Sequence, residues 1–178
     1  ESAKIGMRIN PERDVVKVGT KRIQAKFIKP LTFVLNKPKG FTCSNDDPHA
    51  ERLVFELLEA KHRNIRLFCA GRLDVDSEGL VILTNDGKLA HRLTHPSQQV
   101  RKKYQVEINQ PLESDAFQSM LDGFEDDGDF LRLDQIRAKG GNPVGSTKLE
   151  IIMGHGKKRE IRRCLQRFRY KVKKLRRS

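Results

Sequence analysis

The sequence predicts an α+β fold. Apolar runs of strand length recur through the 178 residues, and only a few amphipathic segments of helical period separate them. These segments do not alternate regularly with the strands, as the βαβ units of a doubly wound sheet would. With 37% hydrophobic and 33% charged residues, the chain is long enough to bury a core beneath a highly charged surface.

The first 29 residues form a short basic segment. Residues 14–19 and 21–23 alternate around Gly19 and Thr20, which predicts a β-hairpin. A segment of this size cannot bury a core by itself. We therefore expect two parts: residues 1–29 as an accessory piece and residues 30–178 as the main domain.

Strands and helices follow in an irregular order after residue 30. Strands are predicted at 31–35, 66–70, 80–83, 103–108, 130–136 and 148–153. Helices are predicted at 51–60, at 88–94 with Asp86 as its N-cap and Pro96 near its end, and around 116–121 with Gly123 as its stop. A last helix is predicted after Gly156, with Ile161, Leu165 and Phe168 on one face.

A polar loop lies between the strands at 66–70 and 80–83. Gly71 and Gly79 bound it, and its charged residues are Arg72, Asp74, Asp76 and Glu78. Catalytic residues are often held on such loops by a rigid scaffold. Loop chemistry alone, however, favours an ordinary solvated loop.

The charge of the chain points to an anionic partner. Its 36 Lys and Arg residues outnumber 23 Asp and Glu, giving a net charge of +13 and a pI near 9.9. Nucleic acid is the first candidate and an anionic membrane the second. Roughly half of residues 157–177 are Lys or Arg, with Glu160 as the only acid. Because the basic helix lacks a broad aromatic face, a membrane-surface role has little support.

Cysteine and histidine spacing favours neither disulfides nor a metal site. Cys43, Cys69 and Cys164 are far apart and form no CxxC pair, which predicts reduced thiols in a cytoplasmic protein. The remaining candidates for metal ligands, His91, His95 and His155, lack a ligand spacing with cysteines or carboxylates. No apolar run reaches transmembrane length, and no signal peptide is recognisable.

Four motifs together resemble one enzyme family. Residues 71–87 read GRLDVDSEGLVILTNDG, which is similar to the signature of the RsuA-type branch of the ribosomal RNA pseudouridine synthases. Residues 36–40 (NKPKG) and 102–106 (KKYQV) resemble two further motifs of that branch. Residues 156–165 resemble its later basic motif, with Arg159-Glu160 where the usual form has His-Gln or Arg-Gln. The matches follow the family's order across most of residues 30–177.

This resemblance implies a fold, an activity and a partner. The fold is the pseudouridine synthase fold, a mostly antiparallel central sheet with flanking helices and a central active-site cleft. Residues 30–178 would be the catalytic domain, and residues 1–29 resemble the end of an S4-like RNA-binding domain. The activity would be isomerisation of one uridine in ribosomal RNA, without cofactor or metal, by a monomer acting on ribosomal RNA or a ribosomal subunit.

The resemblance also implies a catalytic set. It assigns the nucleophile to Asp74, a carboxylate being an established covalent nucleophile at sugar carbons; Asp76 and Glu78 are alternatives by chemistry alone. Attack at ribose C1′, attack on the base and removal of a ribose proton all remain open routes. Arg162 is expected to keep Asp74 ionised, although it could instead bind phosphate. Tyr104 is expected against the flipped uracil, with Leu175 lining the pocket.

Basic residues are expected to hold the RNA. Arg72 could fill the gap left by the flipped base, contact a phosphate or support its own loop. The other candidate phosphate ligands are Lys37, Lys39, Lys102, Lys157, Lys158, Arg159 and Arg163, with Arg101 and Lys103 beside them. A non-enzymatic ribosomal RNA binder or assembly factor on the same fold is the alternative function. The intact set of Asp74, Tyr104 and Arg162 favours the enzyme.

Overall fold

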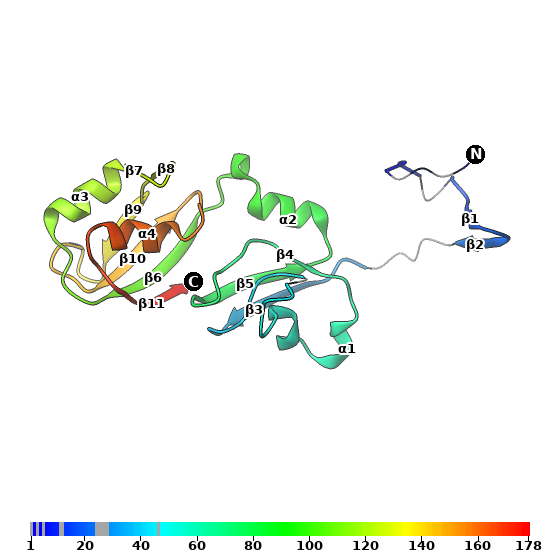
Figure 1. Cartoon of the computed structure of the whole chain (residues 1–178), viewed down its shortest axis with the longest axis horizontal. Coiled ribbons are helices and arrows are strands. Elements are labelled where there is room, and N and C mark those ends of the chain that lie inside the picture. Colours follow the sequence, from blue (N-terminus) through cyan, green and yellow to red (C-terminus); the bar gives the residue numbers. More distant parts are fainter. Residues whose placement is uncertain (1, 3, 5, 11–12, 24–28, 46) are drawn as a thin grey trace. The chain divides into compact units, whose positions relative to one another are not determined.

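The computed structural model describes residues 2, 4, 6–10, 13–23, 29–45 and 47–178. The chain divides into two compact units, Glu1–Pro30 and Leu31–Ser178, each considered by itself (Figure 1). Within the described part of the chain, no helix combines the length and apolar character needed to cross a bilayer.

The first unit contains the predicted hairpin. Strand β1 (Val16–Val18) pairs antiparallel with β2 (Lys21–Ile23), with Val16 opposite Ile23 and Val18 opposite Lys21. Gly19 adopts a positive φ of 59° at the turn, a conformation that glycine takes without steric cost.

The second unit is built on a seven-stranded sheet. Its strand order is β3 (Thr32–Lys37), β5 (Glu78–Thr84), β11 (Val172–Arg177), β6 (Lys102–Ile108), β10 (Lys148–Met153) and β9 (Gln135–Ala138), with β4 (Phe68–Cys69) also pairing with β5. Every pairing is antiparallel except that of β5 with β11. The α+β class and the mostly antiparallel sheet are thus confirmed.

Short helices and a second hairpin surround the sheet. The helical segments are η1 (Val54–Leu57), α1 (Ala60–Arg63), α2 (Gly87–Thr94), η2 (Pro96–Gln98), α3 (Ser114–Asp122) and α4 (Glu160–Arg167). The hairpin joins β7 (Phe124–Asp126) to β8 (Asp129–Leu131). Asp86 caps α2 as predicted, accepting from the backbone N–H groups of Lys88 and Leu89 at 2.9 and 3.1 Å.

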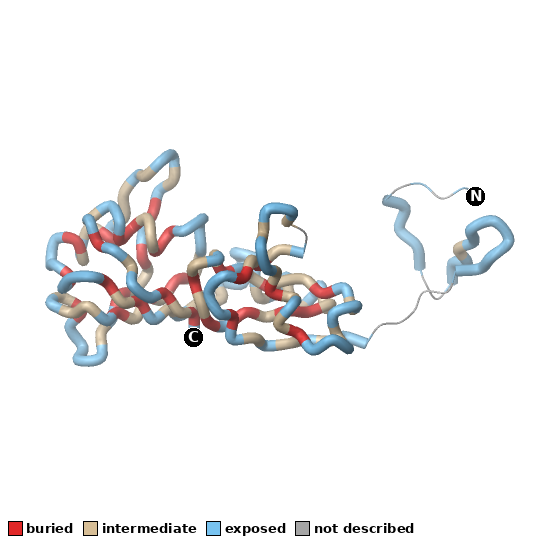
Figure 2. The backbone as a smooth tube through the Cα atoms, turned by 60° about the horizontal axis from the view of Figure 1, so that its bottom comes forward, coloured by how far each residue is buried: buried red, intermediate tan, exposed pale blue. Residues whose placement is uncertain are grey.

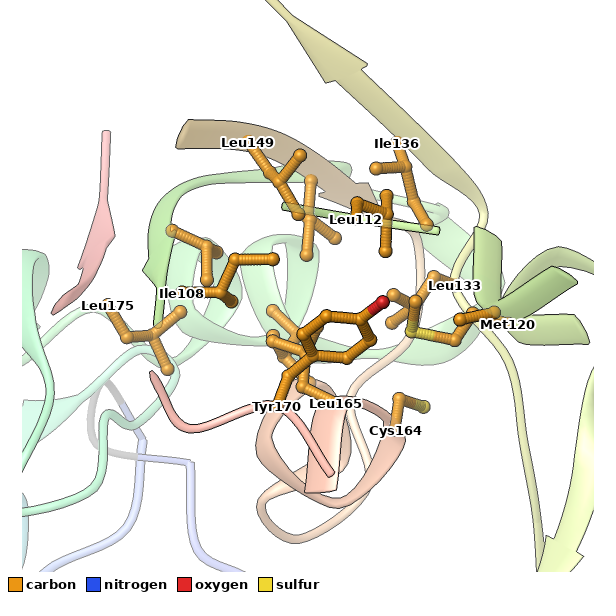
Figure 3. Close-up of a cluster of buried hydrophobic side chains, with 14 of the residues drawn as sticks. Ile108, Leu112, Met120, Leu133, Ile136, Leu149, Cys164, Leu165, Tyr170 and Leu175 are labelled. Atoms are coloured by element: carbon orange, nitrogen blue, oxygen red, sulfur yellow. The ribbon is translucent and has the colours of Figure 1, made fainter. Parts of the chain in front are cut away.

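Two hydrophobic clusters lie in different parts of the sheet, and Figure 2 shows the buried positions along its strands. The larger one joins β6, β9, β10 and β11 to α3 and α4, and Figure 3 shows Leu165 and Tyr170 among its side chains. The smaller one joins β5 to η1 and includes Val54, Val81 and Leu83. Tyr104 packs against both clusters, so it marks the boundary between them.

Three local predictions need correction. The helix expected at 51–60 is instead the 3₁₀ turn η1 followed by α1, because Leu58 between them is extended and its carbonyl accepts from Arg63. The strand expected at 130–136 is divided between β8 and β9. The strand β11 was not predicted at all, although it lies inside the sheet.

Candidate active site

Five separate segments of the chain meet around one cavity of about 740 Å³ in the second unit. The expected catalytic residues Asp74, Tyr104 and Arg162 all line it, together with Leu175. Four of the expected RNA-binding residues also line it: Arg72, Lys157, Lys158 and Arg159. The fold therefore assembles most of the predicted site from residues up to about a hundred positions apart in the sequence.

One wall of the cavity is the segment Arg72–Glu78, here called the acidic loop. A tight turn closes it, in which the N–H of Ser77 donates to the carbonyl of Asp74 at 3.0 Å. The carbonyl of Val75 accepts from the N–H of Gly40 at 2.8 Å. The buried side chain of Leu73 fixes the loop to the smaller hydrophobic cluster.

Two buried cations hold the same loop from beneath. The ammonium of Lys37, whose residue is fully buried, donates to the carbonyl of Ser77 at 2.8 Å. The guanidinium of Arg177 donates to the carbonyls of Arg72 at 3.1 Å and of Leu80 at 2.8 Å. Burial lowers the pKa of Lys37, and the charges of Cys43 and the nearby carboxylates oppose that shift. Both cations donate to backbone carbonyl oxygens, so these hydrogen bonds do not use the loop's carboxylates.

The loop's two aspartates have different partners. Asp76 accepts two hydrogen bonds from Arg159, at 3.0 and 3.3 Å, and lies 3.3 Å from Nε of Arg162. Burial opposes its ionisation, but the hydrogen bonds from Arg159 and the charge of Arg162 hold the pKa of Asp76 below its ordinary value. Among the described residues, Asp74 forms an ion pair only with Arg159, at 4.0 Å, and its side chain is 37% exposed.

The expected pair between Arg162 and Asp74 is therefore corrected. Besides its contact with the Asp76 carboxylate, Arg162 donates to the carbonyl of Asp76 at 3.0 Å and to the hydroxyl of Ser77 at 3.2 Å. The arginine therefore contacts the second carboxylate and the backbone of the turn. It thereby fixes the turn that presents Asp74.

The facing wall is the segment Gly156–Arg159, here called the basic turn. It precedes α4, and Arg159 at the helix N-cap has a positive φ of 54°. The carboxylate of Glu160, only 3% exposed, accepts from the N–H of Lys157 at 2.8 Å and contacts Nδ1 of His155 at 3.1 Å. The other ring nitrogen of His155 contacts Asp134 at 3.2 Å. Buried and half-buried acids thus hold the turn that carries the cations.

Apolar side chains form part of the remaining wall, which also includes Thr42 and Asp47. Tyr104 on β6 lies opposite Arg177 of β11 and Ile151 of β10 in the sheet. Leu175, 5% exposed, belongs to the larger cluster and lines the cavity beside it. A half-buried ring and an aliphatic side chain next to a carboxylate form a surface suited to a planar base.

Two expected RNA ligands have structural roles instead. Lys37 is fully buried under the acidic loop, so it cannot present its charge to RNA. Arg163 donates to the carboxylates of Asp126 and Asp129, each at 2.7 Å, and joins α4 to the β7–β8 hairpin. Of the others, Lys39 is exposed, and Lys102 lines a neighbouring cavity of about 410 Å³ that shares Arg72 and Tyr104 with the first.

Sequence reasoning missed three residues that shape the site. Arg177, His155 and Glu160 each hold one of the two walls. The signal available for Arg177 was its position two residues after the apolar Leu175, on the same face of a strand. The signal for Glu160 was its isolation as the single acid in a basic run.

Cys43 adds a thiol to the cavity wall. A hydrogen bond with the thiol of Cys69 lowers the pKa of Cys43, and the same interaction raises that of Cys69. Among the described residues, no group of three or more His, Cys, Asp or Glu side chains could hold a metal ion.

Comparison with known proteins identifies the family. The family model described as RNA pseudouridylate synthase matches residues 32–167. Ribosomal large subunit pseudouridine synthase B of Vibrio vulnificus is 32% identical, over 98% of this chain and 55% of the relative. Ribosomal small subunit pseudouridine synthase A of Yersinia pestis is 38% identical, over 67% of this chain and 49% of the relative. The chain thus spans about half the length of these curated relatives.

A solved structure supports the same assignment. The crystal structure of a pseudouridylate synthase superposes with a TM-score of 0.73 at 26% identity, covering 96% of this chain and 70% of that one. The family match covers the acidic loop, the basic turn, all of α4 and every strand of the sheet except β11. The chain belongs to the RNA pseudouridylate synthase family.

Proposed function

We propose that the chain is a pseudouridine synthase that isomerises a uridine in ribosomal RNA. One observation carries the proposal: Asp74, Tyr104, Arg162 and Leu175 come from four separate segments and line a single cavity. The net charge of +13 fits an RNA substrate. The two curated relatives described above are named for the large and small ribosomal subunits, which supports ribosomal RNA as the substrate class.

The reaction exchanges one bond for another within the nucleotide. The bond between ribose C1′ and uracil N1 breaks, the base turns, and C5 bonds to C1′. The hydrogen on C5 leaves as a proton, and N1 ends with a proton, so no oxidant or external energy is required. The reaction needs a carboxylate beside the flipped nucleotide and a site that retains the freed base.

Asp74 is the proposed nucleophile. Its side chain lines the cavity with 37% exposure and one distant ion pair, so it is available to a substrate. Asp76 is less suitable, because Arg159 and Arg162 already occupy its carboxylate. Carboxylates form covalent intermediates with sugar carbons in other enzymes.

The other three residues retain and orient the base. We assign Tyr104 to stacking on the uracil, which contributes about 1–3 kcal/mol per base in proteins that bind single strands. Leu175 would close the apolar side of the pocket. Arg162 would act on Asp74 indirectly, by fixing the turn between Asp74 and Ser77.

The test is release of tritium from C5 of labelled uridine in ribosomal RNA, followed by mapping of the modified position. Asp74→Asn is nearly isosteric, and we expect it to reduce release to the background while the protein still folds and binds RNA. Asp76→Asn is the matched control, two residues away in the same turn, and should retain measurable turnover. Wild-type turnover in Asp74→Asn would reject the nucleophile. RNA binding without any release by the wild type would favour the non-enzymatic binder.

A further inference from the structure

A second cationic cavity lies beside the active site. Its volume is about 450 Å³, and it shares Arg159 and Arg162 with the first cavity. Its other charged or polar lining residues follow the outer side and end of α4: Gln166, Arg169, Tyr170 and Lys171. We call this surface the α4 groove. No Asp or Glu of the described part of the chain lines it.

The cations on and after α4 differ in whether a carboxylate neutralises them. Arg163 forms ion pairs with Asp126 and Asp129, both at 2.7 Å, so its charge is neutralised within the protein. Arg159 and Arg162 both pair with the carboxylate of Asp76, and Arg159 also lies 4.0 Å from that of Asp74. Arg169 and Lys171 are exposed, and no described carboxylate lies within ion-pair distance of either. The α4 groove therefore carries an excess of positive charge.

Backbone hydrogen bonds fix the main-chain positions of Arg169 and Lys171. The helix ends at Arg167 with Phe168 as its C-cap, and Arg169 follows with a positive φ of 63°, its N–H donating to the carbonyl of Gln166 at 2.9 Å. The N–H of Lys171 donates to Asn109 at 2.6 Å, which ties this turn to the end of β6. Both side chains therefore start from a fixed backbone turn beside the groove.

The groove lacks a free aromatic surface. Tyr170 is only 3% exposed, and its hydroxyl accepts from the N–H of Glu113 at 2.9 Å. Its ring packs in the larger cluster, as Figure 3 shows, and is not available for stacking on a base. Exposed cations without an accessible ring match the chemistry of phosphates better than that of bases.

We propose that the sugar–phosphate backbone of the RNA leaves the active-site cavity through the α4 groove, with Arg169 and Lys171 contacting its phosphates. This inference rests on the proposed function, because it assigns a path to the same substrate strand. Arg159 and Arg162 connect the two cavities and set the direction of that path. Contacts to phosphates position the RNA and carry no sequence information.

The experiment measures binding directly, by fluorescence anisotropy with two unrelated single-stranded RNAs of equal length over a range of salt concentrations. The test variant is Arg169→Gln with Lys171→Gln. Its matched control is Arg137→Gln with Lys139→Gln, which removes the same two charges from exposed positions at β9, where Arg137 lies on the opposite side of the strand from the buried Ile136. Each lost phosphate contact should reduce the slope of log affinity against log salt by about 0.7.

For the groove variant we expect the slope of log affinity against log salt to be smaller in magnitude by about 1.4 with both RNAs. Its affinity near physiological salt should be roughly tenfold weaker. The control should bind as the wild type does. Equal behaviour of the two variants would overturn the proposal. Loss confined to one RNA with an unchanged slope would also overturn it, because the groove would then read sequence.

A second variant separates a charge effect from misfolding. Arg169→Lys with Lys171→Arg keeps both charges and should preserve the wild-type slope; loss of the slope in this variant would overturn the proposal. Thermal melts of all variants check the fold. Because binding is measured without turnover, absence of tritium release by the wild type would reject the proposed function and leave the groove to be judged on its salt slope.

Discussion

The acidic loop and the basic turn face each other across one cavity, yet the protein holds them in opposite ways. Buried cations hold the acidic loop: Lys37 and Arg177 donate to its carbonyl oxygens or to that of its neighbour Leu80. Buried or half-buried acids hold the basic turn: Glu160 accepts from its backbone and contacts His155. Each wall is thus fixed by the charge opposite to the one it presents.

The two walls differ in whether backbone or side-chain atoms anchor them. The acidic loop is held from beneath through its backbone, so the carboxylate of Asp74 stays available to a ligand. The basic turn is held partly through its side chains, since the ammonium of Lys157 donates to the carbonyl of Phe130 and lies 3.6 Å from Asp129. The comparison suggests that the acidic loop serves chemistry and the basic turn serves binding.

The largest effect should follow from removing the support of the acidic loop. Lys37→Ala deletes a fully buried side chain and leaves the carbonyls of Ser77 and Pro38 without its hydrogen bonds. We expect a loss of about 3 kcal/mol in the free energy of unfolding, measured by urea denaturation. Lys39→Ala is the exposed control, two residues away, and should change stability by less than about 0.5 kcal/mol. Similar effects in both variants would contradict the described support.

Arg162→Met should remove the hydrogen bonds that join α4 to the acidic loop. It removes hydrogen bonds to the carbonyl of Asp76 and to Ser77, at a cost of about 2 kcal/mol in unfolding free energy. The turnover of labelled RNA should fall further than in Arg163→Met, because Arg163 contacts the β7–β8 hairpin and not the acidic loop. Equal loss of turnover in the two variants would argue against a role for Arg162 in presenting Asp74.

His155→Ala tests the support of the basic turn. The carboxylates of Glu160 and Asp134 each lose one contact, and we expect a loss of about 1 kcal/mol by thermal denaturation. In a double-mutant cycle with Glu160→Gln, the two costs should be less than additive, since both changes disrupt the same contact. Strict additivity would show that the histidine and the glutamate act independently.

The smallest effect should be the acid dependence of Asp76. Its pKa lies below the ordinary value near 3.9 because hydrogen bonds from Arg159 and the charge of Arg162 outweigh burial. A depressed folded-state pKa contributes stability above the unfolded-state value, and that contribution is lost as pH falls through the folded-state pKa. The difference in Tm between wild type and Asp76→Asn should therefore shrink below about pH 4. A difference that is constant from pH 6 to about pH 2.5 would count against the pairing.

Local chemistry predicted the elements that depend on it. Asp86 at the start of α2 and Gly123 at the end of α3 act within a few residues, so the sequence is sufficient to place them. Strand β11 depends on distant partners. A register shift between Val172 and Lys174 breaks its alternation, and Arg177 is buried through carbonyls contributed by another strand and loop. Because the segment is so basic, its sequence did not indicate that β11 is a central strand.

The structure brings part of the predicted site together but differs in the pairing of one residue. The resemblance predicted that Asp74, Tyr104, Arg162 and Leu175 lie in one site, and all four line the cavity. The partner of Arg162 was wrong, because a choice between carboxylates two residues apart depends on the geometry of a tight turn. The burial of Lys37 was also unpredictable from its neighbours, since Lys39 in the same motif is exposed.

The parallel contact between β5 and β11 has a mechanical consequence. It pairs Arg176 with Glu78 and Arg177 with Gly79, and a Cβ at Gly79 would overlap the backbone of Arg177. The larger cluster includes residues of β11, the smaller one residues of β5, and Tyr104 touches both. Among the described residues, the register between these two strands is only these two pairs long, so we expect amide hydrogens along this line to exchange earlier than those in either core.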